Sequence, residues 1–159
     1  MLDNVPQSVT HVTPDDQQLL AAVTLGDAMW AESSVYGGME RDIAKMIEFA
    51  YTMRADANSF FEVAVYKGKV IGFLIGSLAA HGFHTDTFAY DRLVYVAPDM
   101  RGGMAARILI TAFEQWARDK GAARVLLGIT TGTRTDATET FYNKMGYRTV
   151  GALTMKEIH

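Results

Sequence analysis

The sequence contains no cysteine, only three prolines, no long apolar run and no excess of basic residues. The lack of cysteine excludes disulfides, cysteine-based zinc sites, iron–sulfur clusters and thiol catalysis. No apolar run approaches the roughly 18 residues of a membrane-spanning helix, so no membrane partner is expected. With 15 Lys and Arg against 18 Asp and Glu, the formal net charge is −3, which argues against a nucleic-acid partner.

The first twelve residues have neither a basic start nor an apolar stretch, so we expect no signal peptide and a cytoplasmic protein. Apolar residues make up 49% and charged residues 21% of the 159 residues, a balance typical of globular proteins. No linker, repeat or low-complexity tract divides the chain. The sequence therefore predicts one domain over residues 1–159.

Hydrophobic periodicity predicts alternating helices and strands. A first helix is expected to begin with Thr13 as N-cap and Pro14 in its first turn, and the last helix to open with a capping box of Asp136 and Glu139. Further helices are expected over residues 40–54 and 103–120, and strands over 8–12, 60–66, 70–79, 88–96 and 125–129, with one or two closing strands in 147–158.

The resulting order, β-α-α-β-β-β-α-β-α-β-β, predicts an α/β fold with a mixed sheet. Three antiparallel strands, joined first by a tight turn at Lys67-Gly68, lead into a parallel β-α-β crossover. Helices are expected on both faces of this mostly antiparallel sheet.

The most informative segment covers residues 94–106, where a strand ends, two glycines follow and a long helix begins. Free N–H groups at a helix start bind anions, and glycines let phosphate oxygens approach the backbone. The alternative is that Gly102-Gly103 only makes a sharp turn. No G-K-[ST] follows, so the segment is not a Walker A loop, and the spaced glycines of a dinucleotide-binding fingerprint are missing.

The pattern V-x-P-x-x-R-G-G-x-x-A over residues 96–106 resembles the acyl-CoA-binding signature of the GNAT superfamily of N-acetyltransferases, in a double-glycine form common among bacterial and phage-encoded members. F-Y-x-x-x-G-Y over residues 141–147 is similar to a second segment of that family. Two positions depart from the family pattern. Met104 stands where a glycine is usual, and Arg92 stands where many members have a glutamate.

The resemblance implies a binding site for acetyl-CoA as co-substrate, without a metal. Backbone N–H groups would hold the pyrophosphate, with the Arg101 side chain as an added phosphate contact and the Met104 side chain pointing into the core. The strand end would hold the pantetheine arm and polarise the acetyl carbonyl. The donor-binding residues implied in this way are Val94, Tyr95, Val96, Arg101, Gly102, Gly103, Met104, Ala105, Ala106, Thr135 and Tyr142.

The resemblance also implies catalytic roles. Tyr142 would protonate the departing thiolate, although helical spacing equally lets its ring pack beside Phe141. The base that takes the proton from the amine is open between Glu32, Asp91 and a water relay. Asp91 would face the wrong side of a regular strand, and a bulge would be needed to redirect it. Ordinary solvated carboxylates are the alternative for both acids. Trp30, Glu32 and Tyr36 are candidates for contact with the acceptor.

The expected function is transfer of an acetyl group from acetyl-CoA to a primary amine of a small molecule or peptide. One alternative is a non-catalytic acyl-CoA-binding sensor or structural protein with the same fold, and another is a different acyl donor or an oxygen acceptor. A homodimer is an open option, since dimers are common among proteins with this resemblance. His81-x-x-His84 is interpreted as part of a surface loop rather than as a metal site.

Overall fold

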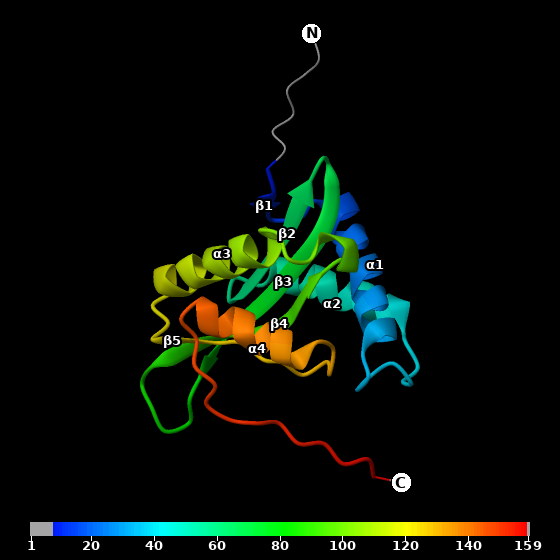
Figure 1. The fold of residues 1–159 in the computed structure, drawn as a ribbon. Helices are drawn as coiled ribbons and strands as arrows, with labels where there is room; N and C mark the ends of the chain where they lie inside the picture. The colour runs from blue at the N-terminus through cyan, green and yellow to red at the C-terminus, as the bar shows by residue number, and fades with distance from the viewer. Residues whose placement is uncertain (1–7, 159) are drawn as a thin grey trace.

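In the computed structural model, residues 8–158 are described, and they form a five-stranded sheet with helices on both faces (Figure 1). The strands are β1 (Thr10–Val12), β2 (Ser59–Tyr66), β3 (Lys69–Ala80), β4 (Thr87–Val96) and β5 (Arg124–Leu126), and the helices are α1 (Asp16–Glu32), α2 (Ile43–Ala55), α3 (Ala105–Asp119) and α4 (Thr135–Lys144). Residues 1–7 and 159 lie outside the described residues. They include both ends of the expected domain and most of the first twelve residues, from which we expected no signal peptide.

The strands follow one another in the sheet in chain order, β1-β2-β3-β4-β5, and only β4 and β5 pair in parallel. The predicted mixed α/β fold and its parallel crossover are confirmed. Lys67 and Gly68 both have positive φ, 49° and 76°, as a two-residue type I′ turn requires. The predicted hairpin between β2 and β3 therefore forms at the predicted residues.

The two faces of the sheet carry two hydrophobic cores. Phe73 on β3 packs under α1 and α2, whereas its neighbour Leu74 packs with Phe113 under α3. Successive strand residues point to opposite faces, so coverage on both sides buries most of β3. Within residues 8–158, no helix is long and apolar enough to cross a membrane.

The helix starts differ from the sequence expectation. Asp15, not Thr13, is the N-cap of α1, because its carboxylate accepts the N–H of Gln18 at 2.8 Å while the Gln18 side chain accepts the N–H of Asp15 at 3.0 Å. The capping box expected at Asp136 does not form. Helix α4 begins two residues earlier than a cap at Asp136 would place it, after Arg134 in a left-handed conformation, so Asp136 already lies inside the first turn.

The closing strands expected in residues 147–158 are also wrong, because no strand is found there. Tyr147 donates a hydrogen bond to Glu114 of α3 at 2.7 Å, and Thr149 bonds to Glu139 of α4. These contacts hold the segment against the two helices instead of beside β5. The rest of the chain then runs away from the sheet beneath α4 (Figure 1).

Candidate active site

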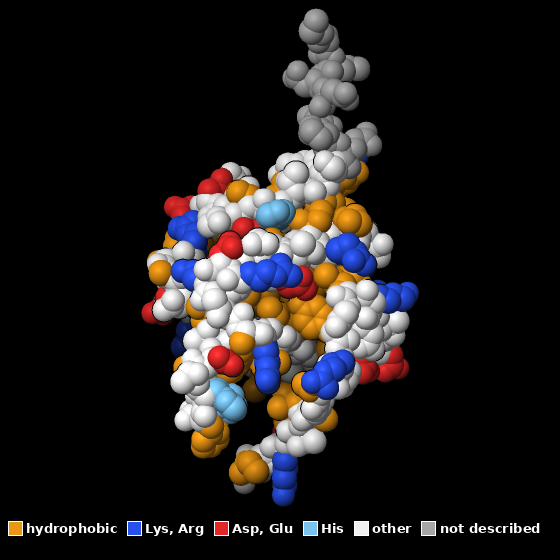
Figure 2. Space-filling view, turned by 90° about the vertical axis from the view of Figure 1, so that its left-hand side faces the viewer, with side chains coloured by type: hydrophobic (Ala, Val, Ile, Leu, Met, Phe, Trp, Pro, Cys, Tyr) orange, Lys and Arg blue, Asp and Glu red, His pale blue; other side chains and the backbone are white. Residues whose placement is uncertain are grey.

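A cleft of about 680 Å³ lies between the second half of β4, the start of α3 and the loop that leads into α4. In the space-filling view, basic side chains lie on both sides of a hollow with apolar side chains at its bottom (Figure 2). Most of the predicted site residues line the cleft: Asp91, Val94, Tyr95, Val96, Arg101, Gly102, Gly103, Met104, Ala106 and Tyr142. The predicted residues that do not line it are Trp30, Glu32, Tyr36, Ala105 and Thr135.

The free edge of β4 forms one wall of the cleft. β4 pairs with β5 only at residues 88–90, and beyond them the two strands separate. The N–H of Ala97 donates to Ile71 of β3 at 2.8 Å, so alternation turns the backbone groups of Val94 and Val96 away from β3 and toward the cleft. This edge can accept an extended chain by backbone hydrogen bonds.

A bulge in β4 turns Asp91 into the cleft. Leu93 lies opposite Ile75, but Asp91 lies opposite Gly76, so Arg92 is an extra residue on β4. Without it, Asp91 would face α1 and α2. The Asp91 carboxylate accepts the N–H of Gly128 at 2.8 Å, near the point where the two strands part. Burial raises the pKa of Asp91 to about 6, even though this hydrogen bond favours the charged form.

Tyr142 lines the cleft from α4. The residue is only 8% exposed, and its ring lies 6.0 Å from that of Phe141, so the packing expected from helical spacing is present as well. Burial, and then the nearby charge of Asp91, raise the pKa of Tyr142. The side chain is therefore a neutral phenol at physiological pH and can donate a proton into the cleft.

The double-glycine loop leads directly into α3. Gly102 has φ of +83°, which only glycine adopts without strain. α3 begins at Ala105, and its N-cap, Met104, makes no side-chain hydrogen bond to the first turn. The N–H groups at this helix start therefore lack a side-chain cap and can bind an anion. The Met104 side chain is 53% exposed, so the expectation that it points into the core is wrong, because the core position belongs to Ala105.

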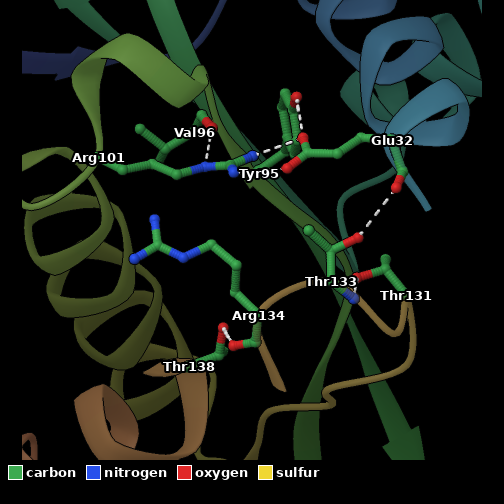
Figure 3. A network of polar contacts seen from close by, with 8 residues as sticks. All are labelled: Glu32, Tyr95, Val96, Arg101, Thr131, Thr133, Arg134 and Thr138. Carbon is green, nitrogen blue, oxygen red and sulfur yellow. Dashed lines mark hydrogen bonds and ion pairs between the residues drawn. The ribbon is translucent and has the colours of Figure 1, made fainter. Parts of the chain in front are cut away.

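Arg101 joins this loop to the end of α1 (Figure 3). Its guanidinium makes a two-pronged ion pair with Glu32 at 2.6 and 2.7 Å, and its Nε donates to the carbonyl oxygen of Val96 at 3.0 Å. Tyr95 also donates to the Glu32 carboxylate, at 2.8 Å. The bonds from Arg101, against the opposing effect of burial, lower the pKa of Glu32. Burial and the bond to Glu32 raise the pKa of Tyr95 to about 12.

The end of α1 is also bonded to the loop before α4. Ser33 donates to the carbonyl oxygen of Thr131 at 2.6 Å, and Thr133 donates to the carbonyl oxygen of Glu32 at 3.4 Å. Just beside these contacts, the rings of Trp30 and Tyr36 stack at 4.7 Å. The residues predicted for the acceptor thus gather at the end of α1, adjoining the cleft through the pair of Glu32 with Arg101.

Several residues of the cleft were not singled out in the sequence. Gly128 bonds Asp91, Arg107 lines the α3 wall, and Arg134 extends from the start of α4 across the cleft toward α3 (Figure 3). No sequence signal marks Arg134, since its place depends on a left-handed backbone at φ 49°. A glycine just after β5 could have indicated that another group comes close to the backbone at Gly128.

Comparison with known proteins places the chain in a family. The model of the acetyltransferase (GNAT) family matches residues 12–147, and the chain therefore belongs to this family. This confirms the family resemblance seen in the sequence. No sequence among the curated proteins matches the chain.

Solved structures with low sequence identity share the fold. The aminoglycoside N-acetyltransferase AAC(6')-Iy, in complex with a bisubstrate analogue of CoA, is 14% identical, with a TM-score of 0.76 and coverage of 96% of this chain and 99% of that chain. A transcriptional regulator from Bacillus halodurans C-125 is 19% identical, with a TM-score of 0.76 and coverage of 94% and 100%. Glucosamine-6-phosphate N-acetyltransferase from Arabidopsis thaliana is 12% identical, with a TM-score of 0.74 and coverage of 96% and 99%.

Proposed function

We propose that this chain is an N-acetyltransferase that moves an acetyl group from acetyl-CoA to a primary amine of a small molecule or peptide. One arrangement carries the proposal. The free backbone edge of β4 runs straight into the uncapped start of α3, and both border a cleft that contains Asp91 and Tyr142. A pantetheine arm needs such an edge, a pyrophosphate needs such a helix start, and acyl transfer needs a proton donor and a proton acceptor between them.

The donor would be held mainly by backbone groups. Val94 and Val96 offer their outward backbone groups to the amides of the pantetheine arm, and the N–H groups from Gly103 to Ala106 face the pyrophosphate. The N–H of Val94 would polarise the acetyl carbonyl as negative charge develops on its oxygen, since the alternation along β4 turns the N–H of Tyr95 toward β3 instead. Acetyl-CoA itself supplies an activated thioester, so the protein has to orient the two substrates and manage protons.

Tyr142 would protonate the thiolate that leaves when the amine displaces it. The raised pKa keeps the phenol protonated, so the proton is available throughout the physiological pH range. Its position on α4, facing the free edge of β4 across the cleft, suits contact with the sulfur end of the pantetheine arm.

Asp91 is our choice for the base that takes the proton from the amine. A carboxyl with a pKa of about 6 is ionised at neutral pH, yet it is basic enough to accept a proton during the reaction. Glu32 is less suited, because its carboxylate already accepts three hydrogen bonds and its pKa is lowered. We assign Glu32 to the acceptor side, with Trp30 and Tyr36.

Further features belong to the same proposal. Gly102 at positive φ and Met104 as N-cap support membership of the double-glycine branch. We expect one domain over the whole chain, a homodimer as one option, and no nucleic-acid or membrane partner. Within residues 8–158, no group of three or more histidine or acidic side chains that could hold a metal ion is found. That the reaction uses no metal is an expectation from the family resemblance alone.

The donor site is tested by isothermal titration of the wild type and of Gly103→Glu with acetyl-CoA. Gly103 is exposed and has room for a side chain, since only the Met100 carbonyl lies near, at 3.5 Å from an added Cβ. The variant should fold, as circular dichroism would check, but its carboxylate should repel the pyrophosphate and abolish binding. If the wild type binds neither acetyl-CoA nor CoA, the proposed function is wrong.

Turnover separates the enzyme from the sensor alternative. CoA release with a panel of primary amines should detect activity in the wild type, and Tyr142→Phe should lower kcat by about 10²-fold while leaving the affinity for acetyl-CoA unchanged. Binding of acetyl-CoA without turnover of any amine would favour the non-catalytic acyl-CoA-binding alternative instead.

A further inference from the structure

The cleft contains a cation whose role the proposed function does not explain. Four arginines line it, and three of their guanidinium groups have a place in the protein. Arg92 bonds Ser77 and lies over the Tyr90 ring, Arg101 pairs with Glu32, and Arg107 lies over the Phe141 ring. For the Arg134 guanidinium, no hydrogen bond, ion pair or ring contact is found among residues 8–158, and its charge acts on Glu32 only as a minor contribution to the lowered pKa of that carboxyl.

Arg101 is not available as a phosphate ligand in this arrangement. Its two terminal nitrogens hold the Glu32 carboxylate at 2.6 and 2.7 Å, and its Nε holds the Val96 carbonyl oxygen. The guanidinium also lies over the Tyr95 ring, with Cζ 5.2 Å from the centroid. Separating the two side chains to free the guanidinium would break both charge-assisted hydrogen bonds of a half-buried pair.

The Arg134 side chain lies where a positive charge could bind a phosphate group in the cleft. Its side chain leaves the start of α4 and crosses the cleft toward α3, below Arg101 (Figure 3). The Gly103 and Met104 backbone, which would bind the pyrophosphate, forms the opposite wall of the same cleft. The backbone of Arg134 is held in place although φ is +49°, since Thr138 donates both its N–H and its hydroxyl to the Arg134 carbonyl oxygen at 3.0 Å.

We propose that the Arg134 guanidinium binds the pyrophosphate of coenzyme A from the α4 side of the cleft, the contact that the sequence had suggested for Arg101. The inference rests on the proposed function. Arg101 then acts as a positioning residue that ties the double-glycine loop to Glu32. A pyrophosphate on the α3 start would lie between the helix N–H groups and a guanidinium that forms charge-assisted hydrogen bonds with its oxygens.

The test is titration of CoA and of dephospho-CoA, which lacks the 3′-phosphate, into the wild type, Arg134→Gln, Arg134→Lys and Arg118→Gln. Arg134→Gln should raise the Kd of both ligands about tenfold. Arg134→Lys should restore part of the lost affinity, because lysine returns the positive charge but not the two-pronged hydrogen-bond geometry of the guanidinium. Arg118→Gln is the matched control, since Arg118 is exposed near the end of α3 and does not line the cleft, and it should bind like the wild type.

The outcomes separate the two claims. If the wild type binds no CoA, the proposed function fails, and this inference fails with it. If the wild type binds CoA and Arg134→Gln binds equally well, only the inference is overturned. A loss seen with CoA but not with dephospho-CoA would also overturn it, since the contact would then be to the 3′-phosphate. Circular dichroism and thermal melting should show that every variant is folded.

Discussion

Asp91 is the residue whose protonation should govern the reaction. Since burial raises its pKa to about 6, the carboxyl is protonated below that pH and cannot accept the proton of the amine. We expect kcat/KM, corrected for ionisation of the acceptor, to fall about tenfold per pH unit below pH 6. The profile from pH 5 to 8 measures this, and a corrected rate that stays constant down to pH 5 would assign the base to another group.

The same burial should make ionised Asp91 lower the free energy of unfolding. Its pKa in the folded protein lies above the usual value of 3.8, so the unfolded chain loses the proton first as the pH rises. Stability therefore falls between about pH 4 and pH 6, and the cost persists above that window. Asp91→Asn keeps an acceptor for the Gly128 N–H but carries no charge. It should be about 1–2 kcal/mol more stable than the wild type at pH 8, equally stable at pH 4, and at least about 10²-fold slower.

Urea unfolding at the two pH values measures the stability difference. An Asp91→Asn variant that is less stable than the wild type at pH 8 would show that the charged carboxylate is stabilised by its surroundings. The pKa of Asp91 would then be lower than burial implies, and the predicted acid limb of the rate profile would be lost as well.

At the scale of elements, the contact between the sheet and α3 depends on Gly76 of β3. A Cβ at Gly76 would lie 2.4 Å from the Phe113 ring, which is fully buried in the core under α3. We expect Gly76→Ala to lower the free energy of unfolding by about 1–3 kcal/mol, because the ring has no free space to move into. Gly38→Ala is the control, since nothing lies within 4 Å of its added Cβ. Equal stability of both variants in urea would contradict this account of the packing.

The elements that the sequence predicted well are those set by local chemistry. The turn at Lys67-Gly68 and the amphipathic helix that ends before Gly121 follow from patterns within a few residues. The bulge at Arg92 does not, because it exists only relative to the partner strand β3. Sequence reasoning could state that Asp91 needed a bulge, but could not predict that one forms. Arg134 was missed for a different reason, since no residue type in the loop marks a left-handed backbone at Arg134 or the direction in which its side chain leaves α4.

At the scale of the whole molecule, the C-terminal segment differs most from the sequence expectation. One or two closing strands were expected there, yet Val150, Leu153, Met155 and Ile158 are 64–85% exposed. β5 is an end strand of the sheet, and among the described residues it pairs only with β4. An exposed apolar segment and an open strand edge on one molecule favour self-association.

We therefore expect the wild type to sediment as a dimer at micromolar concentration and the double variant Leu153→Lys/Met155→Lys to sediment as a monomer. Charge on these side chains should prevent their burial against a second copy. The matched control is Ala152→Lys/Thr154→Lys, which adds the same charge at neighbouring positions of this segment but keeps the two large apolar side chains. The control should remain dimeric.

If both double variants dissociate alike, net charge rather than the apolar side chains decides association. If the wild type is monomeric, the segment does not join two copies. Both double variants should bind CoA like the wild type, since the segment does not line the cleft.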